Sequence, residues 1–294
     1  MPKLSIIILS FNTKEITRKC LDALISSLKK SSFLSQIIVV DNASTDGSTD
    51  MIKEFKKNNT LENVQISSIF NLQNEGYPKG NNRGIHNATG EYILFLNSDA
   101  IINKINWKKI FNYFDKHKKV GALTVRLELP SGQIDLASHR GFPTVWNSFC
   151  YFAKLEELAN LFPFLKRFFG GYHLTHKDLR TIHGIDSPSG AFLLSPKKVI
   201  NELVGFDETY FMYGEDLDLS YRMKELGYKI IYDPCHTVTH LKYQSSTHNR
   251  DIKRKTKEYY YNAMRIFYKK HYDDENNWFI NQLVYFFINL KSRI

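Results

Sequence analysis

The chain has 294 residues, of which 43% are hydrophobic and 24% charged, a composition that supports a folded core and argues against intrinsic disorder. Forty Lys and Arg against thirty Asp and Glu leave a net charge of +10, which suits anionic partners such as nucleotide diphosphates, anionic lipid or nucleic acid. The three cysteines are far apart and lack a Cys-x-x-Cys pair, which argues against zinc or disulfide scaffolds and fits a reducing cytosol.

The first hundred residues alternate between buried strands and amphipathic helices. Residues 6–9 are a β-branched apolar run typical of a strand covered on both faces, and Asn12 with Glu15 is typical of a helix N-terminus. Apolar residues then recur every four positions from Ile16 to Leu28, as on one face of a helix. Further strands are expected at 36–40, 64–69 and 92–96, with a helix around 51–55 and a loop leading into a short helix at 74–90. This order predicts an α/β fold with an open, mostly parallel sheet and ligand loops at the carboxyl ends of its strands.

The pattern weakens between about 125 and 185, where aromatic and basic residues mix and no element is placed. It returns as strands at 190–194, 229–232 and 237–240, and as a helix through Leu219, Met223 and Leu226 that Gly227 ends. We therefore expect one α/β domain over 1–245, with 125–185 as an insertion, and a basic, aromatic helical extension over 246–294. The N-terminus lacks a signal-peptide pattern and no apolar stretch reaches about 20 residues, so any membrane contact is expected to be peripheral.

Carboxylates follow two of the predicted strands, at the edge where such sheets bind ligands. Asp41 can accept hydrogen bonds from a base or ribose, although turn-rich loops also use Asp for their own backbone. Asp99 can hold Mg²⁺ or Mn²⁺ against a diphosphate, because hard cations take oxygen ligands and share them with substrate phosphates. His240, at a strand end, is a candidate metal ligand, although a lone His is more often structural.

Three acids, Glu215, Asp216 and Asp218, stand at the predicted start of a helix. One acid is enough to interact favourably with the helix dipole, by about 0.3 to 1 kcal/mol, so the surplus indicates a second role. A carboxylate beside an acceptor hydroxyl can take its proton as a general base. The first strand is not followed by a glycine-rich phosphate loop, which argues against a nicotinamide enzyme, an ATPase or a nucleotidyltransferase.

Spaced motifs occur in order at residues 5–12, 40–48, 74–84, 96–99, 189–192, 205–208 and 213–222, ending at His240. Together they resemble the bacterial, rhamnosyltransferase-like branch of glycosyltransferase family 2 over about residues 1–245. The resemblance implies a GT-A type fold and an inverting, metal-dependent transfer in surface polysaccharide synthesis. A sugar, rhamnose or another hexose, would pass from a UDP- or dTDP-sugar to a glycan or lipid-linked glycan acceptor, with segment 125–185 on the acceptor side.

The resemblance also implies roles for individual residues. Phe11 would pack on the base and Asp41 would bind the nucleoside. Asp99 and His240 would hold Mg²⁺ or Mn²⁺ with the diphosphate, and Asp216 would be the base. The other residues expected on the donor side are Ser10, Asn74, Gly76, Asn81, Arg83, Asn97 and Ser98, and those on the acceptor side are Glu215 and Gly190.

Two departures from the family pattern, and the alternatives, bear on these roles. Asn97 stands where the family has the first acid of its metal-binding Asp-x-Asp, and Phe11 where an aromatic hydroxyl is common. A protein that binds a sugar nucleotide without turnover and a nucleotidyltransferase are the rival classes, and no nucleic-acid-binding motif is present. Basic residues at 250–257 and aromatic residues after Trp278 favour a cytoplasmic protein whose tail contacts the inner face of the membrane. The alternative is a tail packed on its own domain or on a second subunit.

Overall fold

The structure is a computed structural model that describes residues 1–59, 61–242 and 250–293. Its described strands form a nine-stranded sheet in the order β3-β2-β1-β4-β8-β6-β9-β5, and β7 pairs with β9 outside this path. The strands are β1 (Leu4–Ser10), β2 (Ser35–Asp41), β3 (Val64–Phe70), β4 (Tyr92–Asn97), β5 (Ala100–Lys104), β6 (Val120–Glu128), β7 (His183–Ile185), β8 (Phe192–Pro196) and β9 (Lys229–His240).

Strands β3, β2, β1 and β4 are all parallel, as the sequence predicts. Their register places Ser10 beside Asp41 and Leu9 beside Asn97, so the predicted ligand residues reach the same edge. The other half of the sheet is mixed, because β8 runs antiparallel to β4 and β6, and β9 runs antiparallel to β5 and β7 but parallel to β6. An α/β fold with a partly parallel open sheet results.

The two strands predicted at 229–232 and 237–240 are one strand, β9, so that division was wrong. Pro234 has no backbone N–H for a ladder hydrogen bond, which is why the sequence suggests a break. In the structure the register against β6 shifts at this point, and pairing resumes at Thr237. The bulge absorbs the extra residues, and the strand continues to His240.

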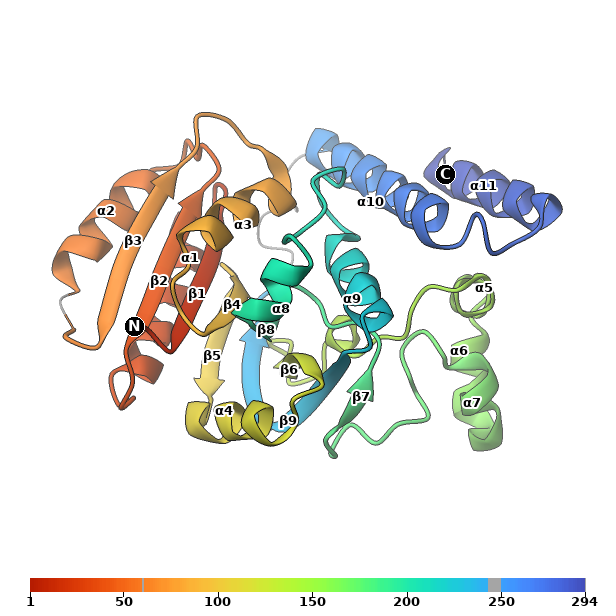
Figure 1. Ribbon diagram of the computed structural model, residues 1–294. Coiled ribbons are helices and arrows are strands. Elements are labelled where there is room, and N and C mark those ends of the chain that lie inside the picture. The colour runs from red at the N-terminus through yellow and green to blue at the C-terminus, as the bar shows by residue number, and fades with distance from the viewer. Residues whose placement is uncertain (60, 243–249, 294) are drawn as a thin grey trace.

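Helices cover both faces of the sheet (Figure 1). One apolar cluster packs α1, α2 and α4 against one face, and a second packs α3, α8 and α9 against the other. The helices are α1 (Lys14–Leu28), α2 (Ser48–Asn58), α3 (Gly76–Asn87), α4 (Trp107–Lys116), α5 (Val145–Phe152), α6 (Leu155–Leu161), α7 (Lys166–Phe169), α8 (Lys197–Glu202), α9 (Glu215–Glu225), α10 (Arg250–His271) and α11 (Trp278–Arg293), with 3-10 turns η1 (Leu136–Ser138) and η2 (Pro163–Leu165).

Helix α3 begins at Gly76 and fills most of the segment predicted to be mainly loop. Two glycines four residues apart allow it to lie directly on β1. A Cβ on Gly80 would come within 2.4 Å of Leu9, and one on Gly84 within 2.5 Å of Ile7. Close packing therefore outweighs the roughly 1 kcal/mol that each helical glycine costs.

The predicted helix N-terminus at Asn12 was also wrong. Helix α1 begins at Lys14 after Thr13, and Asn12 has a positive φ of 52°. Its side chain accepts a hydrogen bond from the backbone nitrogen of Thr45, at 2.7 Å. Asn12 therefore ties the loop after β1 to the loop after β2, a contact that a local helix signal does not reveal.

The extension folds back on the rest of the chain. Phe267 and Tyr268 of α10, with Tyr272 just after it, form a third apolar cluster with Tyr210, and Phe142 and Val145 pack against it. The domain boundary predicted at 245 falls outside the described residues, and within the predicted insertion the first residues, 125–128, complete β6. No helix in the described residues combines the length and the apolar character needed to cross a membrane.

Candidate functional site

The ends of β1, β2 and β4 bring several predicted donor-side residues to one edge of the sheet. Asp41 is 1% exposed, and its two carboxylate oxygens accept hydrogen bonds from the Ser44 backbone nitrogen at 2.9 Å and the Ser44 hydroxyl at 2.6 Å. Asp41 therefore accepts hydrogen bonds within its own turn, as Asp often does in such loops. Its contact with a nucleoside stays a prediction.

Ser10, Phe11 and Ser98 lie around the same loops. The buried Ser10 hydroxyl is 3.2 Å from the Thr17 hydroxyl, and Ser98 Oγ is 3.4 Å from Thr13 Oγ1. The ring of Phe11 is 41% exposed. An exposed ring beside a polar loop can stack on a planar base, so the geometry leaves the predicted role of Phe11 open to test.

The loop before α3 and its first turns hold three further predicted residues. Asn74 Oδ1 accepts a hydrogen bond from the Gly76 backbone nitrogen at 3.0 Å. Gly76 has a φ of 85°, and a Cβ there would lie 2.4 Å from the carbonyl oxygen of Phe211, so this position requires glycine. Asn81 is buried and donates to the carbonyl oxygen of Tyr77 at 3.0 Å.

Arg83, predicted as a phosphate contact, forms a bidentate ion pair with Glu75. Its Nε and one Nη lie 2.6 Å and 2.7 Å from the two carboxylate oxygens. The hydrogen bond from Arg83 is the main reason that the pKa of Glu75 is lowered. A phosphate would have to compete with Glu75 for this guanidinium.

Tyr77 connects the donor side to the acceptor side, and sequence reasoning missed it. Its hydroxyl lies 3.1 Å from Asn97 Oδ1 and 3.2 Å from the carbonyl oxygen of Gly190, where a Cβ would come within 2.5 Å of that hydroxyl. Burial raises the pKa of Tyr77 well above its ordinary value, and three nearby carboxylates add to the shift: Glu215, Asp216 and Asp99. The Tyr77 hydroxyl therefore stays protonated among these groups.

Asp99 and His240 are brought together by the pairing of β5 with β9. His240 Nε2 lies 3.3 Å from Asp99 Oδ1, and His240 Nδ1 donates to Asp135 Oδ2 at 2.8 Å. Asp135, another residue missed from sequence, is 3% exposed and also accepts from Lys242 Nζ at 2.9 Å. Burial alone would lower the pKa of His240, but its hydrogen bonds with Asp135 and Asp99 outweigh burial and raise that pKa to about 9.

The side chains of Asp99 and His240 fit a divalent cation that is also bound by phosphate. Within residues 1–59, 61–242 and 250–293, no three His, Cys, Asp or Glu side chains are arranged to hold a metal ion by themselves. Hard cations such as Mg²⁺ commonly take one or two protein carboxylates and complete their shell with substrate phosphates and water. Metal-binding His residues usually donate their other ring nitrogen to a carboxylate, as His240 does to Asp135.

Two acids at the start of α9, Glu215 and Asp216, also lie near Tyr77. Arg140 Nη2 is 2.6 Å from Asp216 Oδ2, and both side chains are nearly nine-tenths buried. The second Asp216 oxygen accepts from the Leu217 backbone nitrogen at 2.8 Å. Burial opposes the charge of Arg140, but Asp216 outweighs burial and raises the pKa of Arg140 above its ordinary value. Arg140, which sequence reasoning did not assign, therefore fixes the direction of the Asp216 carboxylate.

Glu215 has a different environment from the adjacent Asp216. Its Oε2 is buried and has no hydrogen-bond partner among the described residues. Burial, followed by the charge of Asp216, raises the pKa of Glu215 to about 8. A buried carboxyl group with a raised pKa is typical of functional sites, including those that move protons.

A sequence-family model that covers more than half of the chain identifies its family. The model described as Glycosyl transferase family 2 matches residues 5–176. The chain belongs to glycosyl transferase family 2. The family predicted from spaced motifs is therefore confirmed, whereas its rhamnosyltransferase-like branch stays a prediction.

A curated relative in this family is poly-beta-1,6-N-acetyl-D-glucosamine synthase of Staphylococcus epidermidis, 26% identical over 234 residues. The alignment covers 79% of this chain and 48% of that protein. The family 2 chain thus spans about half the length of this relative.

Solved structures show the same fold. The mannosyltransferase PcManGT from Pyrobaculum calidifontis, in complex with GDP-Man and Mn²⁺, has a TM-score of 0.57 at 15% identity, covering 90% of this chain and 64% of that one. GalNAc-T7 with UDP, GalNAc and Mn²⁺ has a TM-score of 0.58 at 17% identity, covering 82% and 44%. The predicted GT-A type fold is confirmed, and at these identities the likeness extends to the fold alone.

Asp135 gives a first testable prediction for this family 2 site. Asp135→Asn keeps the side-chain volume but weakens the contact that directs His240 at Asp99. Loss of such an outer-shell carboxylate typically lowers metal affinity by about 10 to 100-fold. We expect that loss in Mn²⁺ affinity, measured by electron paramagnetic resonance with UDP present. The matched control is Asp115→Asn, an exposed carboxylate paired with Lys118, which should leave Mn²⁺ binding unchanged. Equal affinity in Asp135→Asn and wild type would contradict this role.

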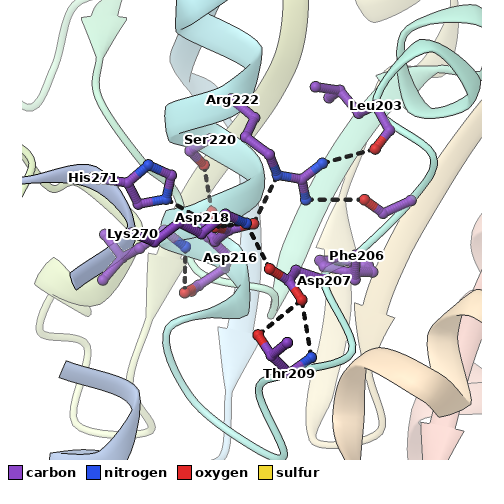
Figure 2. A network of polar contacts seen from close by, with 12 residues as sticks. Leu203, Phe206, Asp207, Thr209, Asp216, Asp218, Ser220, Arg222, Lys270 and His271 are labelled. Carbon is purple, nitrogen blue, oxygen red and sulfur yellow. Dashed lines mark hydrogen bonds and ion pairs between the residues drawn. The ribbon is translucent and has the colours of Figure 1, made fainter. Parts of the chain in front are cut away.

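Helix α9 is anchored to the extension by a buried polar network (Figure 2). Asp218 is fully buried and lies 2.7 Å from Arg222 Nε, 2.7 Å from Lys270 Nζ and 2.8 Å from His271 Nε2. Lys270 also pairs with Asp207, at 2.5 Å. Burial opposes the charge of Asp218, but these partners outweigh burial and lower its pKa to about 2. Asp218, the third acid in the first turn of α9, therefore has a structural role.

A second prediction follows for stability. Asp218→Asn removes the buried carboxylate that pairs with Arg222 and Lys270, and should lower the free energy of unfolding by about 3 kcal/mol, measured by urea denaturation at neutral pH. Because folding lowers the pKa of Asp218, its contribution is present above about pH 4 and is lost as pH falls toward 2. The difference between wild type and Asp218→Asn should shrink over that interval. Asp22→Asn, which breaks an exposed pair with Arg18, should cost under about 1 kcal/mol. A similar loss in both variants would argue against the network.

Proposed function

We propose that this chain is an inverting glycosyltransferase that moves a sugar, rhamnose or another hexose, from a UDP- or dTDP-sugar to a glycan or lipid-linked glycan acceptor. The observation that carries the proposal is the position of Tyr77. Its hydroxyl is near Asp99, which contacts His240, and also near the two acids Glu215 and Asp216. A donor diphosphate on one side and an acceptor hydroxyl on the other would meet at this point.

The reaction would be a single displacement. Asp216 would take the proton of the acceptor hydroxyl while the oxygen of that hydroxyl attacks the anomeric carbon of the donor sugar. The bond from that carbon to the diphosphate would break on the opposite face. The configuration inverts for that reason. Arg140 would hold Asp216 toward the acceptor, and the unpartnered Oε2 of Glu215 would be free to hydrogen-bond a second acceptor group.

Asp99 and His240 would hold Mg²⁺ or Mn²⁺, with Asp135 orienting His240. When bound, such an ion neutralises the charge that develops on the leaving diphosphate. Two solved structures of the same fold contain Mn²⁺, which supports this choice without deciding between the two ions. Asn97 lies where the Tyr77 hydroxyl can orient it, so it would contact the donor through its amide rather than bind the metal as an acid.

A role in polysaccharide synthesis is supported by the name of the curated relative, a poly-beta-1,6-N-acetyl-D-glucosamine synthase. Residues 1–245 would form the donor and catalytic domain, while the insertion within 125–185 and the extension would form the acceptor side. A protein that binds a sugar nucleotide without turnover is the remaining rival, whereas no observation favours a nucleotidyltransferase.

Isothermal calorimetry with UDP and dTDP, each with and without Mn²⁺, tests the donor site. Metal-dependent binding of one nucleotide would support the proposal and select the base for a screen of sugar donors. Release of the nucleoside diphosphate with an acceptor present, and proton magnetic resonance of the new anomeric centre, would then test transfer and inversion. If neither nucleotide binds, the donor site is absent. Binding without turnover of any donor would favour the rival.

A further inference from the structure

Large apolar side chains are exposed mainly on two parts of the molecule. Of the 24 such side chains in the described residues, nine lie on α5 to α7 and six on α11. Those on α5 to α7 are Trp146, Phe149, Tyr151, Phe152, Leu158, Leu161, Phe162, Phe164 and Phe168, and those on α11 are Trp278, Phe279, Leu283, Phe286, Phe287 and Leu290. We call these fifteen residues the aromatic surface. Apolar patches of this kind on a protein mark an interaction site more often than scattered residues do.

Helix α11 has its apolar residues on both faces. Val284, Tyr285 and Ile288 pack inward or are buried, with Val284 and Tyr285 against the cluster around α10. The opposite face, which in an amphipathic surface helix is polar, carries Phe279, Phe286 and other exposed apolar residues. Packing within the chain therefore explains one face of α11 and leaves the other without a partner among the described residues.

The two parts of the aromatic surface meet at one end of the molecule. Lys291, in the last turn of α11, has its Nζ 5.8 Å from the ring centroid of Phe152 in α5. Phe142 and Val145, at the start of α5, pack against the cluster formed by α10. Figure 1 shows α11 and α5 to α7 at the end of the molecule opposite α2 and β3.

Cations border this surface. Lys154, Arg167, Lys291 and Arg293 are exposed on α5 to α7 and α11 or the turns between them, and Lys166 is half-buried. The exposed acid within these elements is Glu157, while Asp274 and Glu275 lie in the turn before α11. Helix α11 separates that turn from Lys291 by about 20 Å, at 1.5 Å per residue. The junction of α5 with the end of α11 is therefore both aromatic and positive.

We propose that the aromatic surface docks on an anionic lipid bilayer, with its rings in the headgroup region and its cations on the lipid phosphates. Aromatic and apolar residues next to Lys and Arg are the composition of peptides and helices that bind such interfaces. A second copy of this chain fits less well, since a two-fold interface would bring like-charged residues together. The docking residues are α11 and α5 to α7, whereas α10 packs on its own domain.

Vesicle flotation tests this surface independently of the donor site. Wild type should float with phosphatidylcholine vesicles that contain phosphatidylglycerol and float far less with phosphatidylcholine alone. Phe286→Ser combined with Phe287→Ser, at side chains 58% and 56% exposed, should weaken partitioning by about tenfold or more. Lys291→Gln combined with Arg293→Gln should weaken it by about fivefold per charge, and less in high salt. Leu34→Ser, 44% exposed and distant from the surface, is the matched control and should bind as wild type does.

Three results would overturn the proposal. The first is wild type that does not float with anionic vesicles. The second is a double variant, Phe286→Ser with Phe287→Ser, that floats as wild type does. The third is a wild-type dimer, seen by light scattering, that this double variant converts to a monomer. Urea denaturation shows whether each variant is folded, and calorimetry with UDP and Mn²⁺ shows whether its donor site is intact. Calorimetry also separates a failure of docking from a failure of the proposed function, because the aromatic surface is remote from β1 and β2.

Discussion

Asp216→Asn is expected to lower the turnover number by about 10² to 10⁴-fold, the contribution usual for a general base. Asn keeps the shape of the side chain and can still accept from Arg140, so nucleotide binding in calorimetry should stay close to wild type. The release of nucleoside diphosphate in the presence of acceptor measures the loss. An unchanged turnover number would remove Asp216 from the mechanism.

Glu215→Gln is the control that separates the two neighbouring acids. Glu215 has a raised pKa, so as the base it would make the rate of the wild type rise with pH until its carboxyl group ionises near pH 8. With Asp216 as the base, Glu215→Gln should retain most of its turnover and change the acceptor KM, because Gln can still hydrogen-bond the acceptor. A greater loss of turnover in Glu215→Gln than in Asp216→Asn, together with loss of that pH-dependent rise, would transfer the role to Glu215.

Asp99→Ala should lower the affinity for UDP or dTDP in the presence of Mn²⁺ by at least about 100-fold, beyond the range usual for an outer-shell residue. The reason is that Asp99 contacts Nε2 of His240, the proposed metal-binding nitrogen, whereas Asp135 contacts the other ring nitrogen, Nδ1. Affinity without Mn²⁺ should change little. Calorimetry of both variants in both conditions measures the difference, and an equal loss with and without Mn²⁺ would indicate a structural role for Asp99.

Asn97→Asp is the matched gain-of-function variant. It restores the acid that the family places two residues before Asp99, while the Tyr77 hydroxyl can still donate to the new carboxylate. We expect Mn²⁺ to bind about tenfold more tightly in the presence of nucleotide, because a second negative charge lies next to the ion. Weaker binding in Asn97→Asp would show that the amide has a specific role.

The parallel half of the sheet could be predicted because its signals are local. Apolar β-branched runs identify β1 and β2, and the rule that parallel strands end at one edge then places Asp41 and Asn97 near each other. Helix α3 was predicted too short, because its glycines favour a loop. The helix is stabilised by the close approach of Gly80 and Gly84 to β1, which is a property of tertiary packing.

Asp135 and Arg140 were missed for a different reason. Asp135 contacts His240 from 105 positions away, and Arg140 contacts Asp216 from 76 positions away. Both lie in a segment whose periodicity places no element, so no local pattern indicates where their side chains point. The available signal was an acid and an arginine close to a Ser131-Gly132 turn in that segment. Sequence therefore identified groups on strand and helix ends, but not the side chains that orient them.

The contacts of Asp218 with α10 limit how this protein can be shortened or recombined. A chain truncated at residue 245 would lose Lys270 and His271, two of the three side chains that pair with Asp218, a carboxylate two residues from Asp216. Exchange of the extension between homologous enzymes would meet the same obstacle unless the first turn of α9 were exchanged with it. We therefore expect α9 and the extension, which are far apart in the gene, to change together during evolution.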